Sequence, residues 1–197
     1  MPKLGMEPIR RQQLIDATLQ SVAEHGFDAT TINKISKRAG LSSGIISHYF
    51  GGKEALIEAT VRHILTQLKA NLLRKTQGQS ISAYQRLMCI VETNFAPIQQ
   101  HHDTTRTWLI FWAQSMHNPT LFRLQQVNSR RLFSNLKSSY RQLMPEDDAQ
   151  QASALTAAMI DGLWLRCVLA KGQQKDFAEA QHLCKQYIHT LISPFGE

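Results

Sequence analysis

The chain has 197 residues, of which 43% are hydrophobic, and this content supports a core in one large or two small domains. A formal charge of +7 at pH 7 favours a polyanionic partner such as nucleic acid. The three cysteines lie far apart without a CxxC pair, and no run of 18 apolar residues occurs. A disulfide framework, a structural zinc site and a membrane-spanning helix are therefore not expected. With no apolar signal core at the N-terminus, we expect a cytoplasmic protein with reduced thiols.

Helical periodicity runs through nearly every segment, and no strand-like alternation occurs. A polar linker is expected at residues 99–105, with Thr104 as the cap of the helix that follows. The pattern predicts an all-α protein with a small N-terminal three-helix head and a larger C-terminal helical bundle. The nine predicted helices cover about residues 8–25, 31–39, 43–49, 53–76, 81–98, 105–117, 132–143, 146–170 and 176–192.

Residues 31–53 have the layout of a DNA-binding helix-turn-helix. Gly40 stands where the first short helix needs a left-handed residue, a conformation that glycine adopts without a Cβ clash. Leu41 fills the turn, and Ser42 and Ser43 are candidate N-caps of the second helix. Four basic residues and no acidic one lie between Asp28 and Glu54, which favours a DNA-facing surface.

The second short helix is the candidate recognition helix. Its small residues allow a close approach to base edges in the major groove, and His48 and Tyr49 have polar tips that reach bases or phosphates. Thr31 and Lys53 begin helices, where backbone N–H groups favour a phosphate. The predicted DNA-binding residues are Thr31, Ser42, Ser43, Gly44, Ile46, Ser47, His48, Tyr49 and Lys53.

Two alternatives remain open for this region. A helix-turn-helix also occurs as a purely structural element of α-helical proteins. Arg10 and Arg11 either add phosphate contacts from an N-terminal arm or belong to a solvated helix start.

Residues 11–57 resemble the DNA-binding head of TetR-family repressors. The resemblance implies a homodimer with a DNA-binding domain at residues 1–53 and an effector-binding and dimerisation domain at residues 54–197. In such a protein an effector weakens the binding of double-stranded DNA. The matching residues are Leu14, Ala17, Gly26, Phe27, Thr30, Thr31, Ile35, Ala39, Gly40, Leu41, Ser42, Gly44, Tyr49, Phe50, Lys53, Glu54 and Leu56.

Further segments are similar to the choline-responsive repressors of glycine betaine synthesis within that family. This similarity implies choline as the effector and genes for choline uptake and oxidation as the targets. A dimer with two heads also implies a roughly palindromic operator, read in successive major grooves. The segments are MPKLGM, SGIISHYF, WLIFWAQSMHNP, LFRLQQVNSRRL and IDGLWLR.

Aromatic residues in the body suit a quaternary ammonium ligand, which proteins hold by aromatic faces and a nearby negative charge. Trp108, Phe111 and Trp112 share one helical face, and Trp164 adds a further indole. Asp161 lies in an apolar run, where a buried carboxylate needs a partner such as a cationic ligand. The alternative for the aromatic residues is ordinary core packing, and Asp161 has the alternatives of an ion pair within the protein and a helix cap.

The last two predicted helices are expected to form the dimer interface as a four-helix bundle with their symmetry mates. Ala154, Ala157, Ala158 and Gly162 allow a close helix approach, although packing within one chain is the alternative.

No sequence motif supports an enzyme, because GxSxG, HExxH and a strand-associated GxGxxG are all absent. Adjacent histidines point apart on a helix, so His101, His102 and Asp103 do not predict a metal site, and no cofactor is expected. The remaining alternatives are a helical interaction protein without DNA and a TetR-type repressor that answers another hydrophobic or cationic effector.

Overall fold

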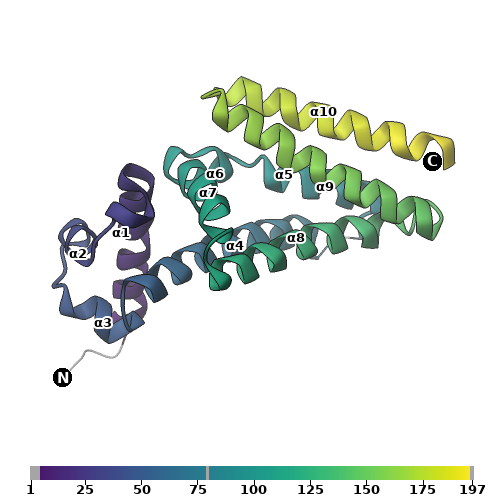
Figure 1. Cartoon of the computed structure of the whole chain (residues 1–197). Helices are drawn as coiled ribbons and strands as arrows, with labels where there is room; N and C mark the ends of the chain where they lie inside the picture. The colour runs from purple at the N-terminus through teal and green to yellow at the C-terminus, as the bar shows by residue number, and fades with distance from the viewer. Residues whose placement is uncertain (1–4, 79, 196–197) are drawn as a thin grey trace. The chain divides into compact units, whose positions relative to one another are not determined.

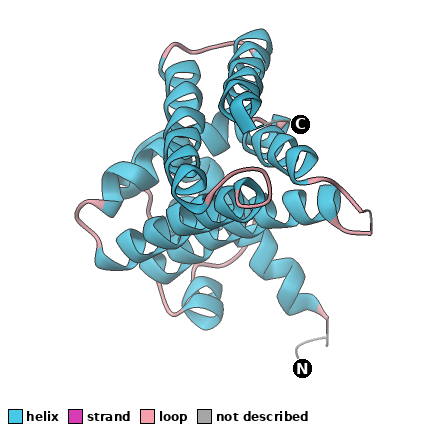
Figure 2. Cartoon of the chain, turned by 90° about the vertical axis from the view of Figure 1, so that its right-hand side faces the viewer, coloured by secondary structure: helices cyan, strands magenta, loops and turns pink. Residues whose placement is uncertain are grey.

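The computed structural model describes residues 5–78 and 80–195, and within them only helices, turns and loops occur (Figures 1 and 2). This confirms the all-α prediction. Nine of the α-helices have seven or more residues, and α6 is a single short turn. The helices are α1 (Met6–Ala29), α2 (Ile32–Ala39), α3 (Gly44–Phe50), α4 (Lys53–Thr76), α5 (Ala83–Asn94), α6 (Pro97–Gln100), α7 (His102–Ser115), α8 (Pro119–Tyr140), α9 (Glu146–Leu169) and α10 (Gln174–Ile192), followed by the 3-10 turn Ser193–Phe195.

The described chain divides into two compact units. Unit 1 contains residues up to 66 together with 101–125, and therefore holds α1–α3, the first part of α4, α7 and the start of α8. Unit 2 contains residues 67–100 and 126 onward, with α5, α6, α9, α10 and the remainder of α4 and α8.

The core of unit 1 holds the two short helices in place. Ile35 of α2 and Ile46 of α3 have no exposed surface and pack with Leu14 of α1 and Leu56 of α4. Isolated helices of seven or eight residues are not stable in water. The burial of one isoleucine from each is therefore what fixes α2 and α3.

Gly26 interrupts α1 with φ 78° and ψ 175°, at the point where the sequence predicts the end of the first helix. Helical residues resume as far as Ala29. The hydroxyl of Thr30 donates to the carbonyl of Gly26 at 2.6 Å, which satisfies one of the groups freed by the break. Contacts from α7 to α1 complete the unit, with Arg106 Nη1 3.2 Å from the carbonyl of Ala23.

Polar contacts between helices stabilise unit 2. Glu92 of α5 binds Lys75 of α4 at 2.6 Å and Lys185 of α10 at 2.7 Å. Burial acts to raise the pKa of Glu92, but the hydrogen bonds from the two lysines lower it overall. The hydroxyl groups of Tyr140 and Thr156 lie 2.8 Å apart and link α8 to α9.

The predicted polar linker at residues 99–105 is wrong. Its first residues belong to α6, and α7 begins at His102, with His101 rather than Thr104 at the N-cap position. Thr104 and Thr105 are buried, and the hydroxyl of Thr105 donates to a backbone carbonyl. A threonine whose hydroxyl bonds to a backbone carbonyl of its own helix can be buried within that helix. The polarity of these residues therefore wrongly indicated a linker.

The predicted helix at residues 81–98 is shorter in the structure. Ser82 and Gln85 form a capping box that starts α5 at Ala83. The helix ends at Asn94 because Pro97 has no N–H to donate and disfavours a helical conformation at Ala96.

One described helix, α9, is long and apolar enough to cross a membrane. The core helices of soluble proteins pass the same test.

Candidate nucleic-acid interface and effector region

The turn between α2 and α3 has the geometry that the sequence predicts. Gly40 is left-handed, with φ 65° and ψ 32°, and the N–H of Leu41 donates to the carbonyl of Ser36 at 2.9 Å. At the other end of α2, the hydroxyl of Thr31 accepts a hydrogen bond from the N–H of Lys34 at 3.3 Å. The Thr31 cap fixes the start of α2. The Gly40 turn fixes its end and therefore sets where α3 begins.

One face of α3 is exposed and made of small or polar residues. Ser43, Gly44, Ser47 and His48 are all exposed, and Ser43 holds the N-cap position without a side-chain capping bond. The His48 and Tyr49 rings lie 4.9 Å apart between centroids at the end of the helix. The surface thus offers hydroxyls and two polar-tipped rings with little steric bulk, which suits a close approach to base edges.

The prediction that Ile46 contacts DNA is wrong. Its side chain has no exposed surface because it faces the core formed with Leu14 and Ile35. Ile46 instead orients the exposed face of α3 away from that core.

Arg11 stabilises the position of α3, a role that neither sequence interpretation included. Its guanidinium donates a hydrogen bond to the carbonyl of Tyr49 and lies 4.2 Å from the centre of the Phe50 ring. Glu7 lies 3.8 Å from the same guanidinium, one helical turn before it on α1. The contact joins residues 38 positions apart, so local sequence pattern could not reveal it.

Two of the four basic residues in the acid-free segment have partners inside unit 1. Arg38 of α2 pairs with Glu24 of α1, and hydrogen bonding by Arg38 lowers the pKa of the Glu24 carboxyl. The Lys34 ammonium donates to the carbonyl of Ala29 at 2.9 Å. Among the described contacts, Lys37 and Lys53 have no such acceptor, which leaves these two cations available for phosphates.

The aromatic residues of α7 pack on one another within unit 1. The Trp108 ring centroid lies 5.6 Å from that of Phe111 and 6.0 Å from that of Trp112. Trp108 and Phe111 are buried, whereas Trp112 is half-buried. This arrangement is compatible with core packing and with the wall of a ligand site, so their effector role stays a prediction.

Asp161 and Trp164, the other two predicted effector residues, belong to α9 in unit 2. Trp164 is buried, and its Nε1 donates to the carbonyl of Gln99 at 3.1 Å. Asp161 as a whole residue has substantial exposed surface on α9. Burial of its carboxyl group nevertheless raises the pKa of Asp161 to about 6, so its effector role stays a prediction.

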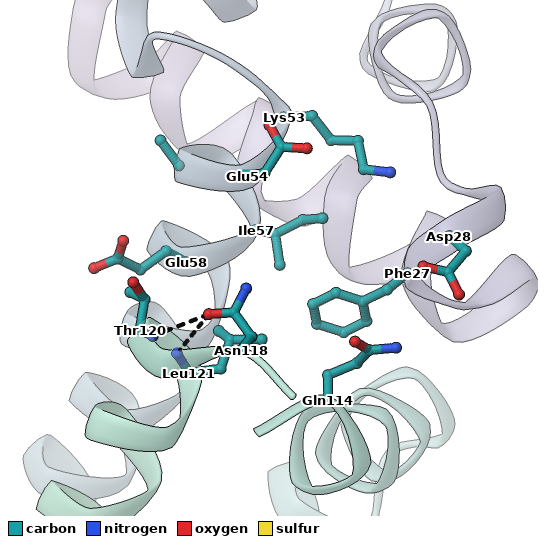
Figure 3. Close-up of a pocket in the computed structure, with 11 residues that line it drawn as sticks. Phe27, Asp28, Lys53, Glu54, Ile57, Glu58, Gln114, Asn118, Thr120 and Leu121 are labelled. Carbon is teal, nitrogen blue, oxygen red and sulfur yellow. Dashed lines mark hydrogen bonds between the residues drawn. The ribbon is translucent and has the colours of Figure 1, made fainter. Parts of the chain in front are cut away.

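Unit 1 also contains a pocket of about 280 Å³ (Figure 3). Residues from four separate segments line it, among them Phe27 of α1, Lys53 of α4, Gln114 of α7 and Leu121 of α8. Among the lining residues the sequence predicted a binding role only for Lys53, because no sequence motif joins residues that far apart. No cluster of three or more metal-ligating side chains occurs among the described residues.

Two family models match separate parts of the chain. Residues 14–60 match the model described as bacterial regulatory proteins of the tetR family. Residues 83–193 match the model described as the C-terminal region of BetI-type transcriptional repressors.

Curated relatives match over nearly the whole length. The chain is 48% identical over 194 residues to the HTH-type transcriptional regulator BetI of Burkholderia mallei, with 98% of this chain and 99% of the relative covered. It is also 48% identical over 197 residues to HTH-type transcriptional regulator BetI 2 of Chromohalobacter salexigens, with 100% and 95% covered.

Solved structures have the same fold. A putative transcriptional regulator from Pseudomonas aeruginosa superposes with a TM-score of 0.81 at 26% identity, covering 94% of this chain and 91% of that one. A putative transcriptional regulator from Saccharomonospora viridis, solved in complex with choline, gives a TM-score of 0.76 at 19% identity, with 92% and 96% covered. At that identity the second comparison concerns the fold alone.

Proposed function

Because the chain belongs to the TetR family of bacterial regulators, and within it to the BetI-type transcriptional repressors, we propose that it controls genes of choline uptake and glycine betaine synthesis. It binds a roughly palindromic operator as a homodimer and responds to choline. The observation that supports the DNA-binding part of this proposal is the exposed polar face of α3. Buried Ile46 on the opposite side of the helix orients that face.

DNA recognition in this proposal divides between base and phosphate contacts. Ser43, Gly44 and Ser47 lie close to base edges, with His48 and Tyr49 at the end of the helix. Ser42, exposed in the turn before α3, and Thr31, exposed at the N-cap of α2, face the DNA backbone. Lys53 binds a phosphate from the first turn of α4, where backbone N–H groups add to the attraction.

The proposed dimer uses exposed surfaces of α9 and α10. Leu155 and Leu169 of α9 are 45% and 66% exposed in the single chain, and Leu183 of α10 is 38% exposed. Ala158 and Gly162, also exposed, allow the partner helices to approach closely. Pairing these surfaces in a four-helix bundle removes the leucines from water.

Choline is the proposed effector because the relatives bear the BetI name and a regulator of the same fold was solved with choline. In this proposal the aromatic residues of α7 receive the trimethylammonium group by cation–π contact. Trp112 has a central role because it is half-buried, whereas Trp108 and Phe111 are buried. A different hydrophobic or cationic effector is the alternative, and the proposed location is the cytoplasm.

A footprint upstream of the neighbouring genes, with and without choline, tests the proposal. We expect protection of a palindromic site that weakens with rising salt, because phosphate contacts release counterions. A footprint insensitive to choline would favour the alternative effector. The absence of any sequence-specific protection would contradict the DNA-binding proposal.

A further inference from the structure

Two polar contacts, one helical turn apart on α1, join α7 to α1 within unit 1. Arg106 Nη1 donates to the carbonyl oxygen of Ala23 at 3.2 Å, and the hydroxyl of Thr107 lies 3.5 Å from the carbonyl oxygen of Leu19. Thr107 is buried, and α1 packs more extensively against α7 than against α2 or α3. The position of α1 therefore depends on α7.

The Ala23 carbonyl lies in the turn of α1 that precedes the interruption at Gly26. Carbonyl groups at the end of a helical segment lack donors from their own helix, and the helix dipole favours a cation there. The guanidinium of Arg106 supplies a donor and a positive charge at this point from the neighbouring helix. Arg106 thus fixes α7 to one level of α1.

The same segment of α1 contacts α3 near its other end. Arg11 donates to the carbonyl of Tyr49 and lies over the Phe50 ring. Ala23 follows Arg11 by twelve residues, a rise of about 18 Å along a regular helix. Because a helix of this length moves as a unit, a displacement of α1 at Ala23 also displaces the residue that holds α3.

Helix α7 also carries the proposed effector residue Trp112, six positions after Arg106. We propose that Arg106 is a positioning residue for operator binding. Its bond to Ala23 holds α1, and through α1 the recognition surface of α3, in the arrangement that binds DNA, and choline on α7 opposes this bond. This inference rests on the proposed function, because it takes the operator and choline as the two ligands.

The assignment fixes the sign of two binding changes. If the bond between Arg106 and Ala23 stabilises the operator-binding arrangement, its loss shifts the protein towards the arrangement that choline favours. Operator binding then weakens and choline binding strengthens. In a two-state equilibrium the two factors multiply to the factor by which the bond stabilised the first arrangement. A residue that only stabilises the fold would not strengthen the binding of choline.

Arg106→Ala, which removes the bond, tests the proposal by operator anisotropy and choline calorimetry at one salt concentration. Arg123→Ala, at an exposed position of α8 in unit 1, is the control for the loss of one positive charge. Arg106→Lys keeps the charge and a donor for the carbonyl. Thr107→Val changes only the second contact, with no change of charge.

Relative to Arg123→Ala, the Arg106→Ala protein should bind the operator more weakly and choline more tightly. The two factors should multiply to about fivefold, the effect of losing one hydrogen bond. Arg106→Lys should restore most of both affinities. Thr107→Val should shift both affinities in the same directions by a smaller factor, because its bond is longer.

Unchanged affinities in Arg106→Ala, or a fall in both, would overturn the positioning role. Equal changes in Arg106→Ala and Arg123→Ala would assign the effect to charge alone and would overturn it as well. If Arg106→Ala does not fold, opposite shifts in Thr107→Val support the proposal and their absence overturns it. If the wild type binds only one of the two ligands, the proposed function fails for the other ligand, and the remaining affinity still tests Arg106.

Discussion

The α3 surface and the α7 aromatic face show how differently two sites can be recognised. On α3, small polar residues are exposed while the opposite side is anchored by fully buried Ile46. That pattern serves no packing purpose on its exposed side, and therefore points to an external partner. On α7, Trp108 and Phe111 are buried against each other. Core packing and ligand binding favour the same aromatic residues on α7, so the arrangement of these side chains is the same for either role.

The largest expected effect comes from comparing the two sides of α3. Ile46→Ala should reduce the free energy of unfolding of unit 1 by about 2–4 kcal/mol, because it removes a buried side chain. Ser47→Ala should leave stability unchanged and weaken only operator binding. Thermal unfolding and anisotropy on both variants measure this contrast. Equal destabilisation by the two substitutions would contradict the assignment of the two faces.

Arg11 provides the next test, because it orients α3 without a predicted base contact. Arg11→Ala should weaken operator binding about tenfold through loss of the Tyr49 and Phe50 contacts. Arg11→Lys keeps the charge but loses the planar stacking, and should recover little. Arg10→Ala is the control, since the described hydrogen bonds of the Arg10 side chain include one to Gln13 of α1 and none to α3. Full recovery by lysine would indicate a simple phosphate contact instead.

Trp112→Ala tests whether the aromatic face binds the effector. Choline affinity should fall by about tenfold, since a cation–π contact in a desolvated site contributes about 2 kcal/mol or less. Operator affinity without choline should remain that of the wild type. Trp112→Phe, which retains a ring, serves as the control. Calorimetry that gives unchanged choline affinity in a folded Trp112→Ala protein would reassign the α7 residues to the core.

Asp161 gives the smallest effect and a defined pH dependence. Its folded pKa of about 6 lies above its ordinary value, so the charged form is disfavoured in the folded state. Asp161→Asn should therefore raise Tm by about 2–4 °C at pH 8. The gain should fall as the pH drops through 6 and vanish below about pH 4, where both states bind the proton. Calorimetric melting at pH 8 and at about pH 4 measures the gain in Tm. A gain that does not depend on pH would contradict the desolvation of the Asp161 carboxyl.

The sequence predicted the elements whose signals are local. Gly40 predicted the left-handed turn, and the succession of apolar residues predicted most of the long helices. For α8 the prediction was wrong in extent, because a helix was expected at about residues 132–143 and α8 spans Pro119–Tyr140. The polarity of Thr104 and Thr105 wrongly predicted a linker, because their burial depends on the packing of α7 against the rest of unit 1. The contact of Arg11 with α3 and the pocket shared by four segments also depend on tertiary structure, so sequence pattern could not predict them.

The central claim is that this repressor releases its operator in response to choline. An anisotropy titration of choline into the preformed complex with the footprinted operator tests it most directly. We expect a saturable loss of operator affinity that requires about tenfold more choline when Trp112 is replaced by alanine. An operator affinity that stays constant up to saturating choline would contradict it.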